Sequence, residues 1–321
     1  MPPPAPLSTL PPPPAARYPR ALLGTCVLPW KADGTCDEPL FRATVRHAVG
    51  HLGPRHYIFG TAGEGYAVTE GQFAAIGRIF AEEMLAAGGV PMVGVISLAL
   101  GTVQERIAAA LEGGVREFQI SLASWGALAD EEMDAFFAAT CGRFPEAKFL
   151  HYNLARARRV LTGADYTRLA GRHPNLVAIK MGGDNVPVLR DVATAAQAAG
   201  VRCFLTEFGF HALAEETGCG LLCALGACEP GLARRWFAAS RAERVALEPV
   251  FRGLHAAAKA ALAGGTYLDG AYDKLYARLH FPDFPLALLP PYRGATLEQF
   301  EHFRAAALAA VASVPNTVPV S

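Results

Sequence analysis

The chain has 321 residues, of which 52% are hydrophobic, and its 29 Lys and Arg residues balance its 29 Asp and Glu residues. A chain of this length can bury a large core, and balanced charge gives no reason to expect nucleic acid or an anionic membrane as a partner. No apolar run approaches the roughly 18 to 20 residues that cross a bilayer, and the N-terminus lacks a basic segment followed by an apolar one. We therefore expect a cytoplasmic globular protein of enzyme size.

The seven cysteines are an odd number spread over predicted strands and helices. This distribution favours small buried side chains in a reducing compartment over a disulfide framework. Cys219, Cys223 and Cys228 lie close in the sequence, but their spacing does not match a zinc knuckle. We expect neither a bound metal nor a cofactor.

Short apolar runs alternate with longer amphipathic segments from about residue 20 to about residue 230. The apolar runs predict eight strands, which are Leu22–Pro29, His56–Gly60, Pro91–Ile96, Glu117–Leu122, Lys148–Asn153, Leu176–Met181, Cys203–Thr206 and Gly220–Leu225. The segments between them predict helices, which are Glu38–Val49, Glu70–Leu85, Val103–Leu111, Glu131–Cys141, Ala164–Ala170, Val186–Ala198, Ala212–Thr217 and one that begins near Gly231.

Continuous apolar strands with a helix between each pair are typical of a parallel sheet that is covered on its outer face. Eight such units predict a (β/α)8 TIM barrel, an α/β fold whose active site forms at the C-terminal ends of the strands. A doubly wound open sheet is the alternative, but no Gly-x-Gly-x-x-Gly turn follows the first strand.

The ends of the chain differ from the barrel segment in composition. Residues 1–20 are rich in Pro and Ala and predict a disordered tail. Beyond the barrel, at 21–230, a C-terminal helical extension is expected over 231–312, followed by a second loose tail at 313–321. Its helices are predicted at Leu232–Leu262, Tyr267–Leu279 and Leu297–Val311.

Lys180 is the most informative residue, because it interrupts the apolar run Leu176–Met181 just before two glycines. The chain has only five lysines and uses Arg for most of its positive charge. Burial can depress the pKa of a lysine, and a neutral amine is a nucleophile toward carbonyl groups. The alternative is an ammonium that reaches water or meets a carboxylate at the edge of the strand.

Two further strand ends carry polar groups. The second strand runs into the glycine-rich turn Gly60-Thr61-Ala62-Gly63-Glu64-Gly65, whose amides can approach an anion. The fifth strand ends in Tyr152-Asn153, and a phenol at that place can donate and accept a proton. A barrel would bring Thr61, Tyr152 and Lys180 to one mouth, which indicates an acid–base site around a nucleophile.

These three segments resemble the dihydrodipicolinate synthase / N-acetylneuraminate lyase family, the class I aldolase-type barrels. The turn is similar to the family's Gly-[Thr/Ser]-Thr-Gly-Glu loop, Tyr152-Asn153 to its Tyr-Asn-x-Pro, and Ile179-Lys180 to its Ile/Val-Lys strand. The lysine lies 28 residues after the tyrosine, as the family pattern requires. The resemblance extends from about residue 20 to residue 312.

The resemblance implies a Schiff-base lyase, either an aldolase or a dehydratase, that acts on pyruvate or another 2-keto acid. Lys180 would attack the keto carbon, Tyr152 would shuttle protons, and Thr61 would hold the tyrosine hydroxyl. The turn around Gly60 and Ala62 would receive the carboxylate, and a main-chain carbonyl near Leu222 would line the pocket. Members are commonly homotetramers, so the resemblance also implies a homo-oligomer, either a dimer or a tetramer.

The chain departs from the family pattern at several positions. Ala62 replaces a threonine of the carboxylate-binding loop, and the segment from Leu122 to Gly126 lacks the tyrosine that completes the proton relay in the synthases. Ala157 stands where the synthases have the arginine that binds the second substrate. These changes predict a second substrate other than aspartate semialdehyde. Trp125 is a candidate for the distal pocket, and Arg158 is a candidate for binding a carboxylate.

Two rival functions remain. A non-catalytic or regulatory barrel could have kept a keto-acid pocket and lost turnover, given the missing tyrosine. A metal-dependent class II aldolase would need ligands such as His47 and His51, which are four residues apart on a predicted helix. Such a pair without a carboxylate at a strand end is more typical of a solvated helix face.

Overall fold

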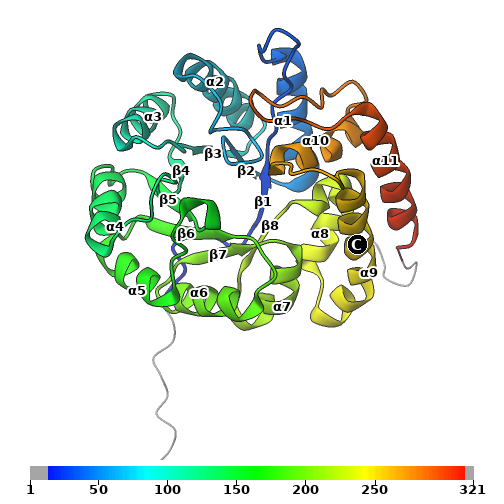
Figure 1. Cartoon of the computed structure of the whole chain (residues 1–321). Coiled ribbons are helices and arrows are strands. Elements are labelled where there is room, and N and C mark those ends of the chain that lie inside the picture. Colours follow the sequence, from blue (N-terminus) through cyan, green and yellow to red (C-terminus); the bar gives the residue numbers. More distant parts are fainter. Residues whose placement is uncertain (1–13, 315–321) are drawn as a thin grey trace, which may run out of the picture.

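The computed structural model describes residues 14–314 and forms a closed barrel of eight parallel strands. The strands pair in chain order, and β8 pairs with β1 to close the barrel (Figure 1). They are β1 Leu22–Thr25, β2 Arg55–Ile58, β3 Val90–Gly94, β4 Glu117–Ile120, β5 Lys148–Tyr152, β6 Leu176–Met181, β7 Arg202–Leu205 and β8 Gly220–Leu222. The predicted (β/α)8 barrel is confirmed.

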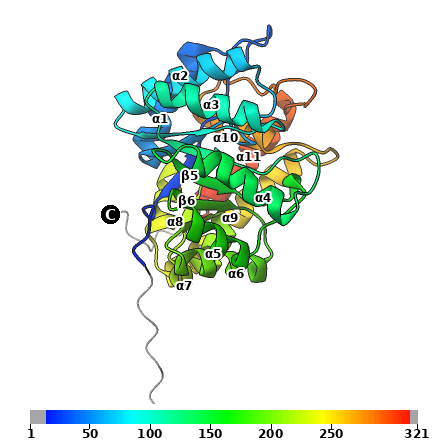
Figure 2. The same ribbon diagram turned by 90° about the vertical axis from the view of Figure 1, so that its left-hand side faces the viewer.

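Eight helices form a ring around these strands, as the two views in Figures 1 and 2 show. They are α1 Glu38–Leu52, α2 Glu70–Ala86, α3 Leu100–Glu112, α4 Asp130–Phe137, α5 Gly163–Arg172, α6 Val186–Ala198, α7 Glu207–Thr217 and α8 Pro230–Ala238. Side-chain caps fix several helix starts, for example Asp37 before α1 and Thr69 before α2. The strands are almost entirely buried because the helices cover their outer faces.

Three more helices follow, which are α9 Arg241–Ala261, α10 Asp269–His280 and α11 Leu297–Ala312. The long run predicted at Leu232–Leu262 is divided between α8 and α9, because Ser240 starts a new helix by accepting a hydrogen bond from the Glu243 amide. The start of α10 lies against the glycine-rich turn, since a Cβ on Gly270 would be 3.0 Å from the Ala62 carbonyl oxygen. The extension therefore borders the barrel mouth.

The N-terminal end of the barrel is closed by Tyr18, which is 1% exposed and packs edge-on against Phe204. Its hydroxyl donates to Glu117, and the guanidinium of Arg55 lies over its ring. The tail expected over residues 1–20 is therefore too long. Residues 1–13 of it lie outside the described residues, but residue 18 belongs to the barrel core because its ring fills the space beneath the strands.

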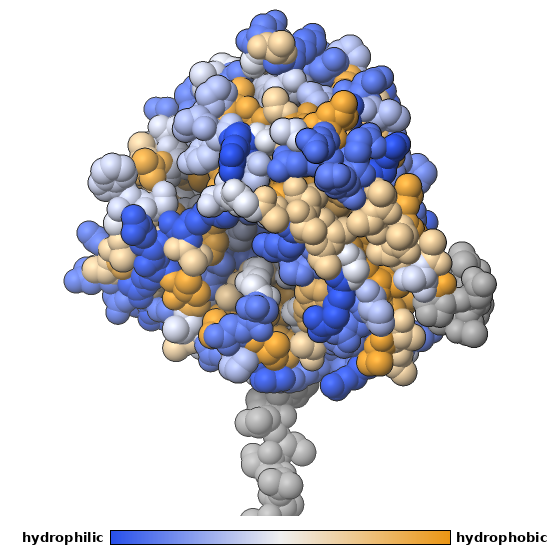
Figure 3. Space-filling view, turned by 45° about the vertical axis from the view of Figure 1, so that its right-hand side comes forward, coloured by the Kyte–Doolittle hydropathy of each residue, from blue (hydrophilic) through white to orange (hydrophobic). Residues whose placement is uncertain are grey.

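Figure 3 shows apolar side chains on the side of the molecule that carries the C-terminal helices. Leu297 and Leu308 of α11 are both more than half exposed. Within residues 14–314, none of the helices is both long enough and apolar enough to cross a membrane.

Candidate active site

Lys180 lies inside the barrel, on β6, with only 2% of its surface exposed. Its Nζ atom lies 3.8 Å from the ring centre of Tyr57 on β2 and 3.9 Å from that of Tyr152 on β5. The same atom donates a hydrogen bond of 2.9 Å to the Gln119 side chain on β4. Side chains from three other strands thus surround one amine, and none of these contacts is with a carboxylate.

Burial lowers the pKa of Lys180 to about 7. The charges of Asp269 and Asp273 act in the opposite direction, but they do not offset the loss of hydration. An ordinary lysine has a pKa near 10.4 and is almost entirely protonated at neutral pH. About half of the Lys180 amine is therefore neutral at pH 7, and the neutral amine is the form that can attack a carbonyl carbon.

Tyr152 and Thr61 form a pair beside this amine. Burial raises the pKa of Tyr152 to about 12, and the hydrogen bond with Thr61 opposes this shift. Thr61 is 5% exposed and borders the main cavity of the mouth. The phenol is neutral at physiological pH and can give up a proton to a group bound at Lys180 and take it back.

Tyr57 and Gln119 also belong to the site, and sequence analysis missed both. Each lies within a predicted strand rather than at its end, and each is buried in the barrel interior. The Nε2 atom of Gln119 is buried and has no hydrogen-bond partner in the part of the chain that the structure describes. A polar residue in the middle of the apolar run Glu117–Leu122 was the available signal.

The glycine-rich turn is held in place by Glu64, which is fully buried. Its carboxylate accepts hydrogen bonds from the indole of Trp30 at 2.8 Å and from the amide of Leu289 at 2.7 Å, and it pairs with Lys274. Glu64 therefore has a structural environment and no contact with the amine of Lys180. It fixes the turn that carries Thr61.

A cavity of about 720 Å³ opens beside Thr61. Its wall is mostly apolar with a few hydroxyl and guanidinium groups, and the polar members are Thr61, Tyr66, Ser97, Arg106, Ser121, Ser124, Arg156 and Tyr292. Arg156 also borders a second cavity of about 350 Å³, which Tyr152 and Asp269 line as well. Arg156 is 3.0 Å from Asp269, so an ion pair separates the two spaces.

The other predicted binding residues lie in different places. Gly60 is next to the Tyr57 ring and the Gln119 amide, where a Cβ would be 2.7 Å from the ring. The side chain of Ala62 packs with Val27 and Phe284, and Leu222 belongs to the interior layer of the barrel.

Trp125 and Arg158 are both exposed, and Trp125 has 87% of its surface in solvent. Neither residue is among those that line the two cavities of the mouth. Arg156, two residues before Arg158, is the arginine that faces both cavities. The reason is local: Ala155–Ala157 form a 3-10 turn, and Arg158 follows it with a left-handed backbone (φ 62°).

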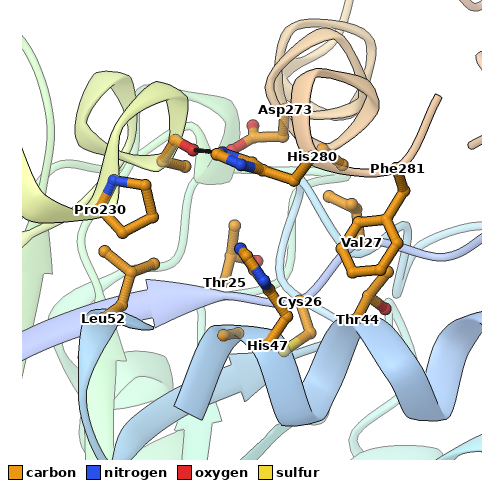
Figure 4. Close-up of a pocket in the computed structure, with 13 residues that line it drawn as sticks. Thr25, Cys26, Val27, Thr44, His47, Leu52, Pro230, Asp273, His280 and Phe281 are labelled. Carbon is orange, nitrogen blue, oxygen red and sulfur yellow. Dashed lines mark hydrogen bonds between the residues drawn. The ribbon is translucent and has the colours of Figure 1, made fainter. Parts of the chain in front are cut away.

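A smaller cavity of about 70 Å³ lies between β1, α1, α8 and α10 (Figure 4). Thr25, His47, Asp273 and His280 border it. The His47 ring lies 4.2 Å from the His51 ring and 4.9 Å from the His280 ring, centre to centre, and burial lowers the pKa of His47 to about 4. Over residues 14–314, no group of three or more side chains has the arrangement of a metal site.

Solved proteins with the same fold include a prophage protein of the dihydrodipicolinic acid synthase family from E. coli K12, in complex with pyruvate. It is 14% identical, with a TM-score of 0.80 over 91% of this chain and 98% of that one. A Thermotoga maritima dihydrodipicolinate synthase is 16% identical, with a TM-score of 0.76 over 91% and 98%. A Ruminococcus gnavus sialic acid aldolase, solved as a catalytic lysine mutant, is 14% identical, with a TM-score of 0.75 over 92% and 98%.

No protein-family model and no curated protein sequence matches the chain. The similar structures share its barrel and its C-terminal helices, and they come from the family that the sequence motifs indicated. At this level of identity the similarity establishes the fold.

Proposed function

We propose that the protein is a class I lyase that forms a Schiff base between Lys180 and pyruvate or another 2-keto acid. One observation carries this proposal: a buried amine, with a pKa of about 7, lies between two phenol rings at the mouth of a barrel. A lysine whose role is packing or a surface ion pair does not require a buried amine between two phenol rings. The pyruvate complex and the catalytic lysine of the similar solved proteins support the same interpretation.

The chemistry follows from the neutral amine. Lys180 attacks the keto carbon, and the carbinolamine that results loses water to form an iminium ion. The iminium withdraws electrons from the neighbouring carbon, so a carbon–carbon bond or a β-leaving group next to it can be made or broken. Tyr152, with Thr61 behind it, supplies and removes the protons that these steps need. The amides of the turn around Gly60 would receive the carboxylate.

The second substrate occupies the cavity of about 720 Å³ in this proposal. The cavity has guanidinium groups at its edge. In this proposal Arg156 releases its ion pair with Asp269 and binds a carboxylate of the substrate instead. We infer an aldolase or dehydratase whose partner compound differs from aspartate semialdehyde, because the segment after β4 carries no phenol. We also expect a homo-oligomer, which light scattering of the purified protein would test.

The test is trapping with borohydride in the presence of pyruvate, followed by peptide mapping. We expect the mass of one reduced pyruvate on the peptide that contains Lys180, and the same adduct in a Lys148→Arg control, in which an exposed lysine is replaced. Absence of the adduct from the native protein would refute the proposal. Sugar acids and hydroxyproline-like compounds are then screened for turnover. An adduct without turnover would favour the non-catalytic keto-acid-binding barrel.

A further inference from the structure

The geometry points to a second acid–base residue in this site: we propose that Tyr57 exchanges protons with the substrate at Lys180, and that Thr25 and Asp273 connect it to the small cavity of Figure 4. This inference rests on the proposed function of Lys180. It assigns a role to three residues that the mechanism above does not use.

Two tyrosine–threonine pairs lie on either side of the amine. Tyr152 pairs with Thr61, and Tyr57 pairs with Thr25. Both rings lie within 4 Å of the Lys180 Nζ atom, at 3.9 and 3.8 Å. Formation of an imine moves one proton off nitrogen and another onto the departing oxygen, so two proton-transfer groups around one amine match the chemistry.

Tyr57 is suited to pass a proton on rather than to keep the charge. Burial raises its pKa well above the usual value, the nearby Asp273 and Tyr152 raise it further, and the hydrogen bond with Thr25 opposes the shift. A phenol in such a place cannot remain ionised after it gives up a proton. It therefore needs a neighbour that replaces the proton as it leaves.

Thr25 provides the connection, because it ends β1 and also borders the small cavity. Its hydroxyl oxygen is buried and has no well-formed hydrogen-bond partner among residues 14–314, and it lies close enough to the Tyr57 hydroxyl to lower the pKa of that phenol. A hydroxyl group both donates and accepts, so it can pass a proton between the phenol and the cavity. The cavity, at about 70 Å³, has room for a few water molecules; its wall is mostly apolar, but Thr25, His47 and Asp273 offer them hydrogen-bond partners.

Asp273 is the acid at the far side of this cavity. Figure 4 shows Asp273 and His280 of α10 on the side opposite Thr25 and His47. Within the described chain the Asp273 carboxyl makes no ion pair and no hydrogen bond with another side chain. It keeps some accessible surface because it borders the cavity, yet its surroundings raise its pKa well above the usual value, through burial first and through Asp269 second. The raised pKa favours the protonated form of this carboxyl, which is the form that the relay uses.

Protons are conserved when the carbinolamine loses water. The carbon–oxygen bond of the carbinolamine breaks, and its oxygen takes the phenolic proton of Tyr57 and leaves as water. The Tyr57 oxygen takes a proton from the Thr25 hydroxyl, which is refilled through the cavity water from Asp273. The products are an iminium cation at Lys180, one water and a carboxylate at Asp273, whose negative charge offsets the new positive one. Hydrolysis of the imine reverses each transfer.

The test uses pyruvate alone, so it does not depend on the second substrate. Two rates are measured in the full-length protein: imine formation, from borohydride trapping after short mixing times, and exchange of the pyruvate methyl hydrogens for deuterium in D2O, by NMR. We expect Tyr57→Phe to slow both by roughly 10²-fold. Tyr166→Phe, which removes another buried hydroxyl outside the mouth, serves as the control and should stay near the native rate.

Two more variants separate the relay from a packing effect. Thr25→Val keeps the shape of the side chain and should slow both rates, which also covers the case in which Tyr57→Phe does not fold. Asp273→Asn should change the pH profile: the native imine-formation rate falls at high pH as Asp273 loses its proton, and this fall disappears in the variant. The other ionisable groups around Asp273 all remain in Asp273→Asn, and they are Tyr57, Tyr152, Lys180, Glu207, Asp269, Tyr276, Cys223, Cys228, Cys26, His47 and His280.

The outcomes are distinguishable. Failure of the native protein to trap pyruvate overturns the proposed function and the relay together. Normal trapping, with native rates in both Tyr57→Phe and Thr25→Val, overturns the relay and leaves the Schiff base at Lys180 standing. An unchanged pH profile in Asp273→Asn removes Asp273 from the proposal.

Discussion

The Nζ atom of Lys274 lies 2.7 Å from Oε1 of Glu64, and neither side chain is exposed to solvent. Lys274 belongs to α10, whereas Glu64 belongs to the turn after β2. The ion pair therefore connects the C-terminal helices to the segment that carries Thr61. The mouth of the barrel is built from two parts of the chain that are about 200 residues apart, and this contact holds them together.

Lys274→Met should destabilise the protein by about 3 to 5 kcal/mol, because it leaves a buried carboxylate without its counter-ion. Urea unfolding monitored by circular dichroism measures the change. The double variant Lys274→Met/Glu64→Gln should recover part of the loss. Arg190→Met, which breaks an exposed pair with Glu216, is the control and should cost less than about 1 kcal/mol. A loss of similar size in both single variants would contradict the assigned role of the buried pair.

Lys180→Arg should abolish adduct formation with pyruvate and borohydride, since a guanidinium stays protonated and cannot attack a carbonyl. Lys180→Ala should do the same through loss of the amine. Intact-protein mass spectrometry reports the result. Residual labelling at the native level in either variant would move the nucleophile to another lysine.

The rate of imine formation should follow a pKa of about 7, as the pKa of Lys180 is lowered mainly by burial. Below that pH the amine is protonated, so the rate should fall about tenfold for each unit of pH. Between pH 7 and 8 the rate should level off. Rapid mixing with pyruvate over a series of buffers measures it. A rate that keeps rising toward pH 10 would show an ordinary, hydrated lysine.

Tyr152→Phe should keep the fold and slow the reaction of pyruvate at Lys180 by roughly 10²-fold or more, which is the usual contribution of a general acid–base group. Deuterium exchange into pyruvate is the measurement, and Tyr166→Phe again controls for the loss of a buried hydroxyl. Native exchange rates in Tyr152→Phe would remove this tyrosine from the mechanism.

Lys180→Met should be more stable than the native protein at neutral pH, and the difference should depend on pH. The folded pKa of Lys180 is about 7, below its value in the unfolded chain. Between the two values the unfolded chain binds more protons, so rising pH stabilises the native protein but not the variant. The gap should be largest at and below pH 7 and should shrink by up to about 1.4 kcal/mol per pH unit above it.

Unfolding of both proteins in urea at several pH values measures this gap. The control is Lys148→Met, which replaces an exposed lysine and should show no such trend. A stability difference for Lys180→Met that is constant across pH would mean that the amine is not held in a low-dielectric site.

The sequence was sufficient to predict the barrel, because short apolar runs and longer amphipathic segments alternate eight times. Strand ends also pointed to Thr61, Tyr152 and Lys180, which the structure brings to one mouth. Tyr57 and Gln119 escaped notice because they lie within apolar runs, where only the closure of the barrel decides which side chains face inward. The sequence likewise could not show which of Arg156 and Arg158 lines the cavity, because a single turn of 3-10 helix determines this.

Asp269 and Asp273 were not foreseen either, since nothing local shows that α10 docks at the mouth. The two acids that act on the Lys180 charge both come from this helix, one turn apart, while the amine comes from β6. The carboxylates around the proposed nucleophile therefore come from a part of the chain that is separate from the strands. Substitutions on the face of α10 that carries these two acids would change the pKa of Lys180 and leave every strand unchanged. That helix is therefore the natural place to vary when this barrel is engineered.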